Sequence, residues 1–239
     1  MTVFESEASI EHKLIQQLTQ GKSQWTFRKD LHTFADLWQN FRHILVQHNK
    51  EMFDAHPLTD NEFQQVQNQL RFPTFYDAAK WLMGENGIVR VRIQREDASL
   101  GTVYPAVFKR ADIAGGSSVY EVVHQIEFPR IETMNRDRRG DVTLLINGMP
   151  MIQIELKNRN HPYREAFNQL KKYLKEGAFR DIFSTLQMFV VSNASDTRYI
   201  ATAAESDLNE QFLSAWLDEK NQPVTEYIAF AKAVLSIPA

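Results

Sequence analysis

The sequence contains no cysteine among its 239 residues, which excludes disulfide bonds and thiolate metal sites. No apolar run approaches the roughly 18 residues that a membrane-spanning helix needs. The first residues, from Met1 to Glu7, are acidic and lack the apolar centre of a secretory signal. The GxxxxGK[ST] pattern of a Walker-type ATP site is also absent. These absences predict a cytoplasmic protein that has no contact with a membrane and no ATP site of its own.

The composition is that of a folded protein, with 43% hydrophobic and 24% charged residues. The formal net charge is −3, but the charge is unevenly distributed along the chain. Residues 130–180 hold eleven Lys/Arg against six Asp/Glu, which is a local balance of +5. Such a basic segment is what a phosphate-binding surface requires. A solvated helix face followed by a basic loop would give the same count.

The apolar pattern predicts helices first, then strands, and then both in alternation. Helical spacing is found over 6–18, 29–47, 60–70, 77–83, 162–176 and 224–235. Strand patterns are found over 88–93, 102–108, 119–128, 141–146, 151–156 and 186–192, with a further short element over 199–204 and an ambiguous one over 212–217. We therefore expect one domain of α/β class. Its parts are a mainly helical segment over 1–86, a core over 87–205 and a C-terminal extension over 206–239.

A pair of apolar strands with charged ends is the most informative stretch of the chain. Asp141 begins the first strand, and Glu155 and Lys157 end the second. Carboxylates and a lysine at the ends of buried strands are costly to leave unpaired. Two neighbouring carboxylates can hold Mg²⁺, a hard cation that prefers oxygen, and the carbonyl of Leu156 could add a third ligand. A purely structural Glu–Lys pair would use the same residues, since three common residues often match by chance.

The connection between these strands decides whether the two carboxylates meet. Side chains alternate along a strand, so the apolar residues at even-numbered positions enter one core only if even positions face even positions. A strict two-residue hairpin at 147–148 breaks that rule. A three-residue connection over 147–149, or an equivalent bulge, obeys it and sets Asp141 opposite Glu155. We predict such an irregularity, with Lys157 on the same face as Glu155 at a solvent-facing strand end.

The helix that follows adds an amide and a phenol. Gln169 and Tyr173 are four residues apart and therefore share one helix face. Beside a metal they could bind phosphate or position Lys157. Packing of a half-buried ring with its hydroxyl at the rim would equally account for Tyr173. The same helix also carries Arg164, Lys171, Lys172 and Lys175.

The combined motifs resemble the PD-(D/E)XK nucleases that carry a QxxxY motif. The residues that match are Asp141, Glu155, Leu156, Lys157, Gln169 and Tyr173. The sequence over 141–169 is similar in more detail to the N-terminal nuclease domain of the restriction (R) subunit of type I restriction-modification enzymes. Segments 6–11 and 191–199 also match, so the resemblance covers most of the chain and is strongest over 135–205. One departure is that Gly140, rather than proline, precedes Asp141.

The resemblance implies a PD-(D/E)XK, restriction-endonuclease-like core, in which helices flank a mixed central sheet, with a helical N-terminal elaboration. It implies a Mg²⁺-dependent endonuclease that cuts double-stranded DNA. In this family the metal-binding positions correspond to Asp141 and Glu155, and the catalytic lysine corresponds to Lys157. The QxxxY pair, here Gln169 and Tyr173, is needed for cleavage.

The resemblance also implies partners. R subunits continue into helicase-like motor domains that use ATP, and they act with modification and specificity subunits. The sequence is therefore expected to be part of a longer protein, ending about where a motor would begin. An assisting glutamate from the first helix of related nucleases could correspond to Glu7 or Glu11, and the sequence does not distinguish the two.

Two other functions remain compatible with these residues. One is a stand-alone repair or phage-defence nuclease of the same superfamily. The other is a non-catalytic DNA-binding or scaffold domain that has kept the fold. A scaffold has no reason to retain all five of the polar residues that match the nuclease motifs.

Overall fold

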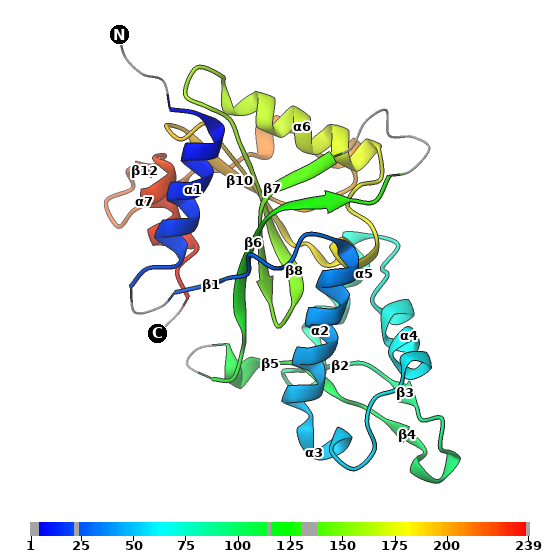
Figure 1. Ribbon diagram of the computed structural model, residues 1–239. Coiled ribbons are helices and arrows are strands. Elements are labelled where there is room, and N and C mark those ends of the chain that lie inside the picture. Colours follow the sequence, from blue (N-terminus) through cyan, green and yellow to red (C-terminus); the bar gives the residue numbers. More distant parts are fainter. Residues whose placement is uncertain (1–4, 22–23, 114–115, 131–137, 238–239) are drawn as a thin grey trace.

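A six-stranded mixed sheet forms the centre of the computed structural model, which describes residues 5–21, 24–113, 116–130 and 138–237 (Figure 1). In spatial order the strands are β1 (Thr26–Phe27), β6 (Tyr120–Phe128), β7 (Arg138–Ile146), β8 (Met149–Leu156), β9 (Met188–Ser192) and β10 (Thr197–Ala201). The pairs β1–β6 and β8–β9 are parallel, and the other neighbours are antiparallel. The predicted α/β class with a mixed central sheet is confirmed.

Helices cover both faces of this sheet. On one face lie α1 (Glu7–Leu18) and α7 (Tyr227–Val234), whose apolar residues share a cluster with Val142, Ile154 and Leu156. On the other face lie α2 (Phe34–His48) and α6 (Tyr163–Lys175). The even-numbered residues of β8 therefore point into a core as predicted, but its odd-numbered face is covered by α6 and does not reach solvent. Among the described residues, no helix combines the length and apolar character needed to cross a membrane.

The remaining helices pack with four short strands at the lower right of Figure 1. These helices are α3 (Lys50–Phe53), α4 (Asp60–Gln69) and α5 (Phe75–Met83). Strand β2 (Ile88–Arg90) pairs with β5 (Ala106–Lys109), and β3 (Ile93–Gln94) pairs with β4 (Thr102–Val103). The strands predicted over 88–93 and 102–108 are thus each split in two, outside the central sheet. Pro105 lies at the break and has no N–H for a ladder bond.

Capping interactions set where the N-terminal helices begin. The hydroxyl of Thr33 accepts a hydrogen bond from Asp36 N at 3.2 Å, and the Asp36 carboxylate accepts one from Thr33 N at 2.8 Å. This capping box starts α2 at residue 34, so the helix predicted over 29–47 is shorter at its N-terminus. Thr59 and Glu62 form a second capping box at the start of α4.

The tip of the β7–β8 hairpin is a two-residue turn. Asn147 and Gly148 have φ of 51° and 77°, the left-handed values that such a turn requires. The Asn147 amide donates to Val107 O and its oxygen accepts from Val119 N, both at 2.8 Å. A Cβ at Gly148 would lie 2.8 Å from the Cα of Phe41 in α2. The tip is therefore fixed tightly against α2, and the three-residue connection that the sequence allowed is wrong.

A bulge corrects the register beyond this turn. Leu145 pairs with Pro150, but Leu144 pairs with Ile152, so Met151 is the extra residue. Pro150 supplies no N–H, which suits a residue beside the interrupted ladder. From the bulge onward even positions face even positions, as the apolar pattern demanded. A bulge equivalent to the predicted connection is therefore present, but it lies at Met151 rather than at 147–149.

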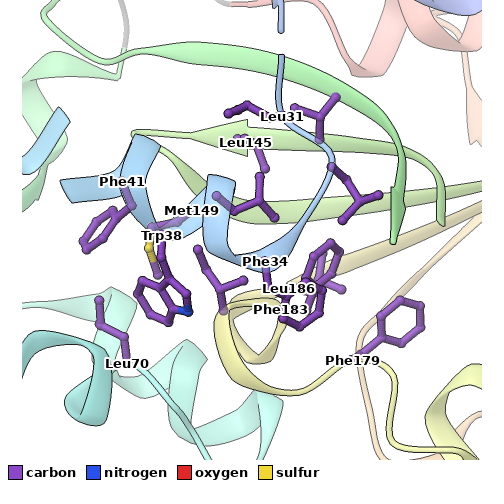
Figure 2. Close-up of a cluster of buried hydrophobic side chains, with 14 of the residues drawn as sticks. Leu31, Phe34, Trp38, Phe41, Leu70, Leu145, Met149, Phe179, Phe183 and Leu186 are labelled. Carbon is purple, nitrogen blue, oxygen red and sulfur yellow. The ribbon is translucent and has the colours of Figure 1, made fainter. Parts of the chain in front are cut away.

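An aromatic cluster joins α2 to the sheet. Figure 2 shows Trp38 and Phe41 of α2 beside Leu145 and Met149 of the hairpin. In the same cluster the rings of Phe34 and Phe183 stack with their centroids 4.9 Å apart. This packing holds the hairpin on the face of the sheet opposite α1. The outer ends of β7 and β8, which are the ends remote from the turn, therefore have a fixed position.

Candidate active site

The outer ends of β7 and β8 bring the two predicted carboxylates together. Val142 pairs with Ile154, so continuing that register places Asp141 opposite Glu155. The Asp141 carboxylate crosses to the second strand, where Oδ2 accepts a hydrogen bond from Leu156 N at 2.8 Å. This bond fixes the orientation of Asp141 beside Glu155. The juxtaposition predicted from strand parity is therefore present.

Glu155 is completely buried and is held by two side-chain amides. Its Oε1 accepts a hydrogen bond from Gln153 Nε2 at 2.8 Å, and its Oε2 accepts one from Gln169 Nε2 at 2.7 Å. The Gln153 oxygen in turn accepts from Thr143 Oγ1 at 2.7 Å. These neutral donors orient the carboxylate, but they do not neutralise its charge.

The two residues predicted to share one helix face, Gln169 and Tyr173 of α6, belong to the same network. Gln169 Nε2 also lies 2.7 Å from the hydroxyl of Tyr173, which donates to the carbonyl of Arg139 at 3.0 Å. Burial and the charge of Glu155 raise the pKa of Tyr173, so the phenol stays protonated and can donate. Tyr173 is only 5% exposed, so its hydroxyl is not at the rim. It ties α6 to the start of β7 and holds the Gln169 amide in place.

Lys157 follows the last residue of β8 and points toward the first helix. Its Nζ donates to Leu156 O at 3.1 Å and lies 3.6 Å from Glu7 Oε2. The side chain is only 16% exposed, so the expected solvent-facing position is wrong. The reason is that α1 lies against this end of the sheet (Figure 1), which no feature of the strand sequence indicated.

The two candidate glutamates of α1 have different partners. Glu7 faces Lys157, whereas Glu11 Oε1 lies 2.7 Å from His124 Nδ1 and Oε2 accepts from Gln125 Nε2 at 2.6 Å. Gln125 lies within β6 and has φ of 51°, an uncommon value for a residue with a side chain. No sequence pattern indicated His124 or Gln125, because their contacts with Glu11 span more than a hundred positions.

Both carboxylates of the strand pair resist ionisation. Burial raises the pKa of Asp141 to about 6, against the opposing effects of the Leu156 N–H and the Lys157 charge. Burial, followed by repulsion from Asp141, raises the pKa of Glu155 well above its ordinary range. A divalent cation relieves both effects, because it supplies positive charge to two carboxylates that share one site.

The donor set fits a hard cation with incomplete protein coordination. Among the described residues, no group of three or more His, Asp or Glu side chains is arranged to hold a metal ion. The candidate ligands are therefore the two carboxylates of Asp141 and Glu155 and the carbonyl of Leu156. All three are oxygens, and Mg²⁺ characteristically keeps several waters beside one or two carboxylates.

Gly140 occupies the place where the resemblance led us to expect proline. A Cβ at this position would lie 2.7 Å from Gln153 Nε2 and 3.1 Å from Cζ of Phe128. Because Gln153 is fully buried and fixed by its hydrogen bonds, its side chain cannot move aside without breaking the bond to Glu155. The glycine is thus required by the amide that orients the site.

We expect Gly140→Ala to lower the free energy of unfolding by about 1–3 kcal/mol, because overpacking displaces the Gln153 side chain. Thermal and urea unfolding of the purified domain measure this change. Arg139→Ala is the matched control, since it truncates the neighbouring exposed side chain and keeps the backbone carbonyl that Tyr173 uses. Equal stability of Gly140→Ala and the wild-type protein would contradict the packing argument.

Comparison with known proteins identifies the family. A family profile described as the N terminus of the type I restriction enzyme R protein matches residues 4–208. The chain belongs to this family. The matched segment contains all of the site residues, from α1 to Tyr173. The domain is accordingly an N-terminal domain of the R-protein type.

Individual relatives of this R-protein domain agree with the profile. The endonuclease subunit of type I restriction enzyme SauMSSORF170P from Staphylococcus aureus (strain MSSA476) is 30% identical over 233 residues, covering 97% of this chain and 23% of that protein. The EcoprrI endonuclease subunit from Escherichia coli is 46% identical over 86 residues, covering 35% of this chain and 28% of that protein. The sequence thus spans about a quarter of the length of these relatives.

Proposed function

We propose that this R-protein domain is a Mg²⁺-dependent endonuclease of the PD-(D/E)XK type that hydrolyses phosphodiester bonds of double-stranded DNA within a type I restriction enzyme. The observation that carries the proposal is the Asp141–Glu155 pair, fixed across two strands with Lys157 at the same end. The names of the relatives support it, since they are endonuclease subunits of type I restriction enzymes.

Asp141, Glu155 and the carbonyl of Leu156 are the groups that would hold the metal. A bound Mg²⁺ supplies positive charge that favours ionisation of water and screens the negative phosphate. The protein itself contributes orientation. The Leu156 N–H directs Asp141, and the amides of Gln153 and Gln169 direct Glu155. A carboxylate oxygen that accepts one such bond keeps a lone pair for a cation.

Lys157 is proposed to act on the phosphate or on the attacking water. Its ammonium group has three donors, and among the described residues their partners are the Leu156 carbonyl and the more distant Glu7. A donor aimed at developing negative charge stabilises a transition state more than a ground state. Gln169 and Tyr173 act less directly, since they hold the Glu155 carboxylate from the α6 side.

We propose further that the domain works in the cytoplasm as part of a larger R subunit. ATP would be used by motor domains outside this sequence, and modification and specificity subunits would complete the enzyme. The domain carries no base-reading element that we recognise, so the choice of DNA sequence would rest with the specificity subunit. Cleavage could then depend on the motor bringing DNA to the site.

Metal binding provides the direct test. We expect calorimetric titration with Mg²⁺ or Mn²⁺ to give a saturable heat with the wild-type domain and none with Asp141→Ala, because that variant lacks one of the two carboxylate ligands. Asp54→Ala is the control, since Asp54 is an exposed carboxylate on another part of the surface. A non-catalytic scaffold would give no specific heat in any of the three proteins, and that result would overturn the proposal.

A further inference from the structure

The outward face of α6 carries the positive charge beside the site. Helix α6 has four basic residues, and two of them are paired with the C-terminal segment. Arg164 contacts Glu210, and Lys171 Nζ lies 3.6 Å from Glu205 Oε1. These pairs neutralise the cations on the side of α6 that faces residues 205–210.

The other two basic residues of α6 are Lys172 and Lys175. Among the described residues, no carboxylate lies within 4.0 Å of the charged group of Lys172 or Lys175. Both side chains are exposed. They are therefore the cations of this helix that remain available to an external anion.

The position of Lys172 connects this charge to the site. Lys172 is three residues after Gln169, so the two are neighbours on the helix surface, and Gln169 donates directly to Glu155. Lys175 is three residues further on and extends the same exposed face. Asn168 is exposed on this face as well. The one acidic residue of the helix is Glu165, which lies in its first turn and pairs with His161 at 2.9 Å.

We infer that Lys172 and Lys175 bind the phosphodiester backbone of the DNA strand next to the scissile bond. This inference rests on the proposed function and names the surface that receives the substrate. Each strand of a duplex presents one phosphate per about 3.4 Å of helix axis, so a strand held at Glu155 has further phosphates within reach of α6. Lysine meets such phosphates as a point charge that tolerates any base sequence. That suits a domain without a base-reading element.

A second role for these lysines is stabilisation of the helix itself. Both lie in the last turn of α6, where positive charge interacts favourably with the helix dipole. That role predicts a change in thermal stability, but it predicts no change in the salt dependence of DNA binding. The two roles are therefore separated by measuring both quantities on the same variants.

The test is a binding titration of the 239-residue domain with a fluorescent duplex of about 20 base pairs in EDTA, at several salt concentrations. The variant is Lys172→Gln/Lys175→Gln, because glutamine removes the charge and keeps a similar helix propensity. The control is Lys220→Gln/Lys232→Gln, two exposed lysines away from α6. We expect the variant to bind about tenfold more weakly and its salt slope to fall by about 2, at roughly 0.9 per lost phosphate contact.

Each other outcome has a definite meaning. If the wild-type domain binds and the α6 variant has the same salt slope, the inference is wrong while the proposed nuclease function stands. A control pair that weakens binding as much as the α6 pair also overturns the inference, since the effect is then one of net charge. If the wild-type domain shows no binding even at low salt, Lys172 and Lys175 do not hold DNA by themselves and the inference is wrong, while the proposed function is still decided by the metal titration.

Discussion

Lys157→Ala is expected to reduce DNA cleavage by at least about a hundredfold while changing the free energy of unfolding by less than about 1 kcal/mol. Cleavage should be lost because the ammonium group at the end of β8 is the only cation that the structure places in contact with the Leu156 carbonyl among the described residues. Stability should be kept because the remaining partner, Glu7, is 44% exposed and can be solvated when Lys157 is gone. The cleavage assay uses the full-length R subunit with its partner subunits.

Two further variants make this result specific. Lys232→Ala removes an exposed lysine of α7 and should cut DNA at the wild-type rate. Glu7→Gln removes the carboxylate 3.6 Å from Lys157 and tests whether that contact positions the ammonium group. Wild-type cleavage by Lys157→Ala would show that the residue has a structural role only. Unfolding of that variant, seen by circular dichroism, would show that its charge is needed for the fold.

Periodicity predicted the longer helices and the longer central strands because each of these elements buries one apolar stripe or face, but it did not predict the short elements α3 and β1. The boundaries depended on interactions that a pattern does not display. The capping box of Thr33 and Asp36 starts α2 five residues later than the pattern suggested. Pro105 and the pairing of short strands divided the segments predicted over 88–93 and 102–108. Local propensity indicates that an element exists, whereas tertiary contacts decide where it ends.

The site was predictable where it follows from strand and helix geometry. Alternation along two strands placed Asp141 opposite Glu155, and the four-residue spacing placed Gln169 with Tyr173 on one face. The alternation of side chains requires one extra residue between the two strands, but it does not say where that residue lies. The sequence therefore predicted either a longer turn or a bulge, and the structure has the bulge. The burial of Lys157 was not predictable, since it depends on α1 docking from a distant part of the chain.

Without a metal, the two buried carboxylates of the site destabilise the domain once they ionise. In the metal-free domain we expect the contribution of Asp141 to the free energy of unfolding to fall as pH rises from about 4 to about 6. The pKa of Asp141 is raised from 3.8 to about 6 in the folded protein, so the unfolded chain loses this proton first. The stabilising proton is fully present below pH 3.8 and is lost as pH rises through about 6. Buried Glu155 extends the same trend to higher pH, because its pKa is raised as well.

Asp141→Asn should abolish most of this loss, since asparagine cannot ionise and its oxygen can still accept from Leu156 N. At pH 7.5 without metal we expect the variant to be more stable than wild type by about 1–3 kcal/mol, the equivalent of one or two pKa units. Added Mg²⁺ should stabilise the wild-type domain by mass action and leave Asp141→Asn nearly unchanged. Asp54→Asn, at an exposed position, should behave as wild type in both respects. If Asp141→Asn is instead less stable at pH 7.5, the hydrogen bond from Leu156 N to the carboxylate stabilises the fold by more than burial of its charge destabilises it. That result would contradict the claim that the carboxylate pair is electrostatically unfavourable without a cation.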